Sequence, residues 1–292
     1  MRLVLSLLLL MLALPAFAQD ADLSEEEKFW NDVMSQAIYG PDTVTVNAVG
    51  EFELPEGMIY LPKKAAVAFS EYMGNPAGDS LEGIIFSEDE DWAGYVEYYA
   101  EGYISDDDAK EMDADAILKI YEDGNKEANK ERVKMGTAEI EIAGWAAKPQ
   151  YNAEQHILVW AMNIKEKGVE TAAEDLIINY NTYVLGRSGY FDMTFVTDAS
   201  VFEAQKPIAD NIISNIKFVS GEDYASFDPE KDKDSGLGLT ALIAGGGAVV
   251  AKKVGLIAVI AKFGKVIIAG VIGVAAVIFK RKQKKKNSMY SE

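Results

Sequence analysis

An apolar run near the C-terminus, residues 254–279, restricts most strongly what this chain can fold into. A helix crosses the hydrocarbon core of a bilayer with ~20 apolar residues, and the run from Val254 to Phe279 is longer than that. Six basic residues follow it at once: Lys280, Arg281, Lys282, Lys284, Lys285 and Lys286. Because the cytoplasmic flanks of membrane helices are rich in Lys and Arg, the sequence predicts a transmembrane helix at 254–279 and a basic cytoplasmic tail at 280–292.

Two lysines inside this predicted helix, Lys262 and Lys265, agree with that topology. They lie three residues apart on one face, and helix side chains lean toward the N-terminus, so both ammonium groups can extend to the outer surface. Ala269 and Gly273 form a small pair at i, i+4 that permits close contact with another helix. Membrane lipid is therefore an expected partner of this anchor.

A second apolar segment, residues 237–251, precedes Lys252 and Lys253. As a helix it is only ~22 Å long, and it contains three consecutive glycines at 245–247. A hairpin of two spans is the alternative, but it would leave the basic tail outside, against the distribution of charge that membrane proteins follow. We predict one span, with 237–251 as a membrane-proximal segment.

The N-terminus has the pattern of a secretory signal peptide at residues 1–18. Arg2 precedes an apolar run at 3–14, and the small-residue pattern Ala16-Phe17-Ala18 follows Pro15. An uncleaved anchor is the alternative. Together with the C-terminal span, the signal peptide predicts an exported domain at 19–222 and a polar linker at 223–236. The expected location is the cytoplasmic (inner) membrane, with one span and the main domain periplasmic or extracytoplasmic.

Charge and cysteine content narrow the classes of function. Residues 19–251 carry 17 Lys and Arg against 46 Asp and Glu, a net charge of about −29. Such a surface repels phosphate backbones, so nucleic-acid binding is excluded. We interpret the acidic surface as a means of keeping the domain soluble. The alternative is that this surface binds a basic partner. The chain has no cysteine, which removes disulfides and thiol nucleophiles.

The exported part has the pattern of an α+β fold, an antiparallel sheet meander covered by helices. Phe191, Met193 and Phe195 alternate with polar residues, and the tight connection at 186–189 predicts that the flanking strands pair antiparallel. Strands are expected at 43–46, 52–54, 58–61, 82–86, 92–99, 138–145, 156–164, 175–185 and 190–197. Helices are expected at 24–38, 65–73, 114–134 and 200–216.

Candidate site residues are few. His156 is the sole histidine and begins an apolar strand, which is typical of a structural histidine. Asp106, Asp107 and Asp108 are candidate Ca²⁺ ligands because Ca²⁺ takes six to eight oxygens, although they lack the spacing of an EF-hand and a solvated acidic loop is the alternative. Arg132 and Arg187 are expected to pair with a carboxylate or with an anionic ligand. The sequence predicts no catalytic group and no cofactor.

An ordered series of short motifs resembles one bacterial family. The series is Asn75-Pro76, Gly102-Tyr103, Asp106-Asp107, Asn129 with Arg132 and Gly136, Gly144-Trp145 with Pro149 and Tyr151, Trp160-Ala161, Asn179-Tyr180, Leu185-Gly186-Arg187, Gly221, Tyr224, Lys233 and Gly236. It resembles the membrane-anchored proteins of domain-of-unknown-function family 2167. The resemblance implies an exported domain on a C-terminal anchor and no particular activity. Asn152 departs from the pattern, which has an acid there, so a carboxylate role at that position is in doubt.

Two hypotheses about function follow. The first is a non-catalytic binding or accessory module of the envelope, whose acidic domain binds a protein partner. The alternative is a carboxylate-dependent hydrolase acting on a wall or glycan substrate. A close pair of buried carboxylates in a cleft would favour the hydrolase, and an exposed apolar or aromatic patch would favour the binding module. Tyr95, Tyr98, Tyr99 and Tyr103 are candidates for such a patch, although a tyrosine-rich strand is more often the half-buried face of a sheet.

Overall fold

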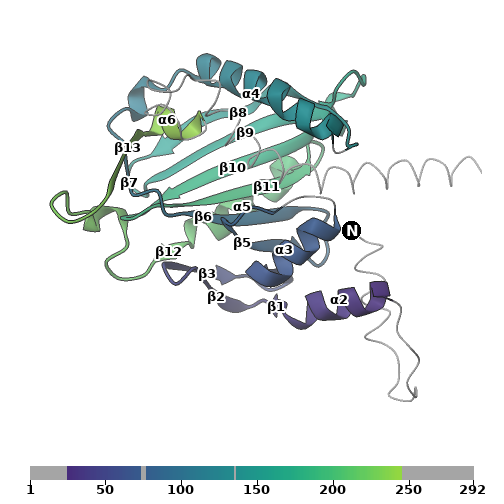
Figure 1. The fold of residues 1–292 in the computed structure, drawn as a ribbon, viewed down its shortest axis with the longest axis horizontal. Helices are drawn as coiled ribbons and strands as arrows, with labels where there is room; N and C mark the ends of the chain where they lie inside the picture. Colours follow the sequence, from purple (N-terminus) through teal and green to yellow (C-terminus); the bar gives the residue numbers. More distant parts are fainter. Residues whose placement is uncertain (1–24, 74–76, 135, 245–292) are drawn as a thin grey trace, which may run out of the picture.

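The computed structural model describes residues 25–73, 77–134 and 136–244, which form an α+β domain around one eight-stranded antiparallel sheet (Figure 1). Every neighbouring pair in this sheet is antiparallel. From edge to edge the strands are β1 (Ile38–Tyr39), β4 (Met58–Pro62), β5 (Leu81–Ser87), β6 (Ala93–Tyr99), β11 (Tyr190–Asp198), β10 (Ile177–Leu185), β9 (Ile157–Glu166) and β8 (Ile140–Asn152). The predicted fold class, an antiparallel sheet with helices packed on it, is confirmed for this part of the chain.

Two runs of sequential strands build the sheet from its two edges inward. The first runs from β4 through β5 to β6, and the second runs from β8 through β9 and β10 to β11. They meet at one central pairing, β6 with β11, where Glu97 lies directly opposite Asp192. The tight turn at 186–189 joins β10 to β11, and the two strands pair antiparallel as the sequence predicted, with Leu185 opposite Tyr190.

One face of the sheet is covered by helix α5 (Phe202–Ser214) and by a small sheet of β12 (Lys217–Phe218), β3 (Gly50–Leu54) and β2 (Asp42–Val46). Every second residue of the central strands faces this layer. Phe191, Met193 and Phe195 are buried there, as their alternation with polar residues predicts. The resulting core positions α5 beside the end of the sheet at which β8 and β9 join.

The opposite face carries helices α3 (Lys63–Tyr72) and α4 (Ala114–Lys134), with α2 (Glu25–Ser35) packed on α3. Figure 1 shows α4 along β8 and β9 and α3 beside β5. Of the four tyrosines that were candidates for an aromatic patch, Tyr95 and Tyr98 are buried, and Tyr99 and Tyr103 are half-buried. These tyrosines belong to the packed faces of the sheet region and do not form an exposed aromatic surface.

The segment predicted to be a linker, 223–236, is largely structured. It holds the short helix η3 (Tyr224–Ser226) and most of β13 (Asp234–Gly238), which pairs in parallel with β7 (Tyr103–Ser105). Helix α6 (Leu239–Ile243) follows, and its residues Leu239, Leu242 and Ile243 are buried. The folded domain therefore extends at least to α6. The sequence did not indicate this, because the strand that pairs with this segment lies about 130 residues earlier in the chain.

Helix α6 is capped by the acidic loop before α4, which also contains the short helix η1 (Ala109–Glu111). The Asp108 carboxylate accepts hydrogen bonds from the backbone N–H groups of Leu239 at 2.8 Å and Thr240 at 3.0 Å. An added Cβ on Gly238 would lie 2.6 Å from Asp108 Oδ2, so only glycine leaves room for this cap. One more short helix, η2 (Ala173–Asp175), precedes β10.

The predicted signal peptide at 1–18, the helix at 254–279 and the tail at 280–292 lie outside the described residues, and so does the second part of the membrane-proximal segment, residues 245–251. The anchor residues Val254, Lys262, Lys265, Ala269, Gly273, Phe279, Lys280 and Arg281 are among them. Within residues 25–73, 77–134 and 136–244, no helix is both long and apolar enough to cross a membrane.

Candidate functional site

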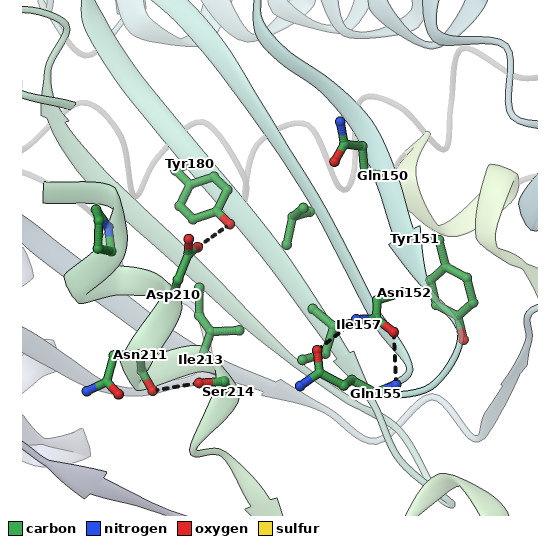
Figure 2. A pocket seen from close by; sticks show the side chains of 12 residues that line it. Gln150, Tyr151, Asn152, Gln155, Ile157, Tyr180, Asp210, Asn211, Ile213 and Ser214 are labelled. Atoms are coloured by element: carbon green, nitrogen blue, oxygen red, sulfur yellow. Dashed lines mark hydrogen bonds between the residues drawn. The ribbon is translucent and has the colours of Figure 1, made fainter. Parts of the chain in front are cut away.

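An open groove of about 560 Å³ lies between helix α5 and the end of the sheet at β8, β9 and β10. We call it the α5 groove. Its walls combine side-chain amides, two tyrosines, one carboxylate and a small apolar surface (Figure 2). The lining residues are Gln150, Tyr151, Asn152, Gln155, Ile157, Val159, Tyr180, Pro207, Asp210, Asn211, Ile213 and Ser214.

The sheet side of the groove follows from strand register. Gln150 pairs with Val159 and Asn152 with Ile157, so these four residues occupy the face of the sheet that α5 covers. Strand β8 is the edge of the sheet, and α5 packs over the more central strands. The outermost part of this face therefore stays open and forms the groove.

A carboxylate and a tyrosine connect the two walls. Figure 2 shows the Tyr180 hydroxyl, from β10, pointing toward Asp210 on α5. This hydroxyl donates a hydrogen bond to Asp210 Oδ1 at 2.7 Å, while Lys206 Nζ lies 2.6 Å from Asp210 Oδ2. The same ammonium group lies 4.9 Å from the centroid of the Tyr180 ring. Burial and the bond to Asp210 raise the pKa of Tyr180, so the hydroxyl keeps its proton and stays a donor.

The turn between β8 and β9 forms the rim of the groove and explains Asn152. Its Oδ1 accepts the backbone N–H groups of Glu154 at 2.9 Å and Gln155 at 3.2 Å, and its Nδ2 donates to Gln155 Oε1 at 2.8 Å. Asn152 therefore caps a turn. An acid at this position could accept the same two backbone N–H groups, so the turn can form with either side chain.

The sole histidine lies beside the same rim. Tyr151, which lines the groove, donates its hydroxyl proton to Asp106 Oδ2 at 2.7 Å, and its oxygen lies 3.1 Å from His156 Nδ1. The His156 ring stacks on Tyr224 with centroids 4.1 Å apart. Burial and the bond to Asp106 raise the pKa of Tyr151. No serine or threonine hydroxyl bonds to this ring within the described residues, so the cluster lacks the arrangement of a nucleophile with its base.

The three acids of the loop do not converge on one point. Asp106 accepts from Tyr151, Asp107 Oδ2 accepts from the Ser105 hydroxyl at 2.9 Å, and Asp108 caps α6. In the part of the chain that the structure describes, no group of three or more His, Cys, Asp or Glu side chains is placed to hold a metal ion. The candidate Ca²⁺ ligands therefore act separately as structural acceptors.

Arg187 pairs with a carboxylate. Its Nε and Nη2 donate to the two oxygens of Asp232 at 2.7 and 2.8 Å, and its Nη1 donates to the carbonyl of Gly221 at 3.0 Å. These bonds hold the pKa of Asp232 below its usual value. Arg187 thus ties the turn between β10 and β11 to the segment that leads into β13.

Arg132 has neutral partners instead. It is 1% exposed on the inner side of α4, and its Nη1 donates to Asn129 Oδ1 at 2.6 Å and Asn125 Oδ1 at 3.0 Å. Both asparagines also donate to the carbonyl of Ile140 at 2.8 Å. Burial lowers the pKa of Arg132 to about 10. Its Nε and Nη2 are buried and have no hydrogen-bond partner among the described residues, so this arginine does not present its charge to solvent.

A pair of carboxyl groups that the sequence did not indicate lies at the centre of the sheet. Glu97 and Asp192 are opposite each other on β6 and β11 and face the α4 side. Glu97 accepts from the Ser80 hydroxyl at 2.8 Å and the Tyr99 hydroxyl at 3.3 Å, while Asp192 Oδ1 has no partner among the described residues. Burial raises the pKa of both groups, and repulsion by Glu97 raises that of Asp192 further. The α5 groove lies on the other face of the sheet, so this pair is no part of it.

Fold and site together define an α+β domain with an open, largely neutral polar groove. The chain belongs to the family described as "Protein of unknown function (DUF2167)", whose model matches residues 38–277. The match confirms the resemblance that the ordered motifs indicated.

The solution structure of cyanobacterial PsbP (CyanoP) from Synechocystis sp. PCC 6803 is similar with a TM-score of 0.38 and 10% identity, over 70% of this chain and 99% of that one. The Ran-binding protein Mog1p of Saccharomyces cerevisiae is similar with a TM-score of 0.34 and 8% identity, over 65% and 100%. None of the curated proteins matches this chain in sequence.

Proposed function

We propose that this protein is a non-catalytic binding module of the bacterial envelope, which holds a protein partner in its α5 groove. A single membrane span at 254–279 fixes it to the cytoplasmic membrane, and its acidic domain lies outside the cytoplasm. The apolar run with its basic flank and the signal-peptide pattern at 1–18 support this location.

The observation that carries the binding role is the chemistry of the groove. Its polar groups are mostly amides and hydroxyls, which can fix the orientation of a ligand, and its apolar residues Ile157, Val159 and Ile213 offer contact area. Asp210 is the one carboxylate among the described residues that line it. A glycan hydrolase needs two carboxyl groups ~5 to 9 Å apart on either side of the bond to be cleaved, so the groove favours binding over hydrolysis.

Co-purification tests this function. Tagged full-length protein is extracted in mild detergent and its partners are quantified by mass spectrometry beside those of Asn211→Trp. Asn211 is an exposed residue of α5 that lines the groove, so tryptophan fills the groove without entering the core. Glu203→Trp, on an exposed position of the same helix outside the groove, is the matched control.

We expect a near-stoichiometric partner with the wild type and with Glu203→Trp, and its loss with Asn211→Trp. A version that ends at Ala244 keeps every described element and shows whether the anchor or the domain holds the partner. Isolation of all forms without a partner would overturn the binding proposal, and equal capture by both tryptophan variants would remove the groove from it.

A further inference from the structure

We infer that the α5 groove takes an arginine side chain from an extended basic segment of the partner protein, in the place that Lys206 now occupies against Asp210. This inference rests on the proposed function and specifies the chemistry of the partner. It starts from a subsite that already holds a cation within the molecule.

The subsite consists of a carboxylate beside an aromatic ring. Asp210 Oδ2 lies 2.6 Å from Lys206 Nζ, and the Tyr180 ring centroid lies 4.9 Å from the same nitrogen. Tyr180 is 2% exposed, and its hydroxyl is bonded to Asp210 Oδ1, so ring and carboxylate hold each other in place. A cation near an aromatic ring and next to a carboxylate gains from both groups.

Lys206 is a weakly held occupant. The side chains of Lys206 and Asp210 are 32% and 44% exposed, and such partly solvated pairs contribute little to stability. The lysine also precedes the acid by four residues, which is the less favourable order on a helix. A guanidinium group offers a planar fork with two parallel donors to a carboxylate and stacks better on a ring, so exchange for arginine is favourable.

The rest of the groove suits an extended peptide. Asp210 is the one charged residue among the described residues that line it, and Lys206, which is not part of that lining, now balances its charge. A single arginine in place of Lys206 keeps this balance. The amides of Gln150, Gln155 and Asn211 can pair with peptide N–H and C=O groups. The chain has a formal net charge of −19, which attracts basic segments and repels anionic polymers.

Binding of a labelled pentapeptide to the full-length protein in neutral detergent tests this inference. The probe is Gly-Gly-Arg-Gly-Gly with blocked ends and a fluorophore, followed by fluorescence anisotropy. The same peptide with citrulline, which has the shape of arginine without its charge, is the matched probe.

Two substitutions give opposite expected effects. Asp210→Asn removes the carboxylate and should weaken binding at least tenfold, with Glu203→Gln as the control for the lost charge. Lys206→Ala removes the internal competitor and should strengthen binding about twofold, since a pair of this kind is weak. Lys217→Ala, at an exposed position of β12, is its control. Circular dichroism melting verifies that each variant is folded.

Equal binding of the arginine and citrulline peptides would overturn the inference, and so would binding to Lys206→Ala no tighter than to Lys217→Ala. The experiments distinguish failure of this inference from failure of the proposed binding function. If the tryptophan variant in the groove loses its partner while the arginine peptide does not bind, the groove is a docking site for a partner of other chemistry. If the peptide binds as expected but no partner co-purifies, the cation subsite stands without the docking role.

Discussion

Two carboxyl groups at the centre of the sheet make the stability of this domain depend on pH in an uncommon direction. Most carboxyls of folded proteins have lowered pKa values and lose stabilising interactions in acid. Burial raises the pKa of both Glu97 and Asp192. Between the ordinary carboxyl pKa near ~4 and these raised values, the folded chain binds more protons than the unfolded chain. The contribution of this pair to the free energy of unfolding therefore falls as pH rises.

Replacing Asp192 by Asn should flatten that dependence. The substitution removes one acid and relieves the repulsion on the other, so the free energy of unfolding should rise at both pH values, and by at least about 1 kcal/mol more at pH 8 than at pH 5. Urea unfolding at pH 5, 6, 7 and 8 measures this difference. Asp91→Asn, in an exposed loop, is the control for the loss of one charge. An unchanged pH dependence in Asp192→Asn would show that the pair titrates as in the unfolded chain.

Sequence patterns identified many residues of the site region but not their partners. Tyr151 and Asp106 are 45 residues apart, and so are Arg187 and Asp232, yet both pairs are in direct contact. Nothing in the local sequence distinguishes Asp232 from its many acidic neighbours. Asp210 escaped notice for the same reason, because an acid on an amphipathic helix usually faces solvent.

At the level of elements, periodicity was a good guide where each element packs against its neighbours in sequence. The strands β9, β10 and β11 and the helix α4 lie close to where alternation and helical spacing predicted them. The α5 groove could not be predicted, because it depends on how far α5 extends over a sheet whose edge is β8. Strand β13 and helix α6 were assigned to a linker and a membrane-proximal segment, since their partner β7 is distant in the sequence.

We predict that the residue at which a truncated version ends determines how stable the domain is. A version ending at Gly236 loses Leu237, Leu239, Leu242 and Ile243, all of which are buried. Each such side chain contributes about 2 kcal/mol or more, so this version should unfold at a much lower urea concentration than one ending at Ala244. Urea unfolding followed by tryptophan fluorescence compares the two. Equal midpoints would mean that α6 does not contribute to the core.

The whole molecule carries a large excess of negative charge, with 47 Asp and Glu against 28 Lys and Arg. Individual ion pairs such as that of Arg187 and Asp232 are weakened by salt, but the summed self-repulsion of the folded chain is screened as well. With so large an imbalance, the relief of repulsion should exceed the loss of the pairs. Acidity of this degree therefore lowers the stability of the compact state at low ionic strength.

Accordingly, the melting temperature should rise when sodium chloride is increased from 10 to 100 mM, which shortens the screening length from about 30 to about 10 Å. Differential scanning fluorimetry of the full-length protein in neutral detergent at pH 7.5 measures the shift. Potassium chloride serves as a control for a specific effect of sodium. A melting temperature that falls with salt would show that the ion pairs outweigh the repulsion.

The position of the central pairing, β6 with β11, decides how the chain can be divided. Residues before α4 and residues after it each build their part of the sheet from an edge inward. Either half alone would end in a strand with a free row of backbone groups and apolar side chains, at what is the middle of the intact sheet. Neither half is therefore expected to fold on its own as an independent domain. Cleavage in the connection around α4 would instead yield two complementary pieces, each of which offers the other the strand that it lacks.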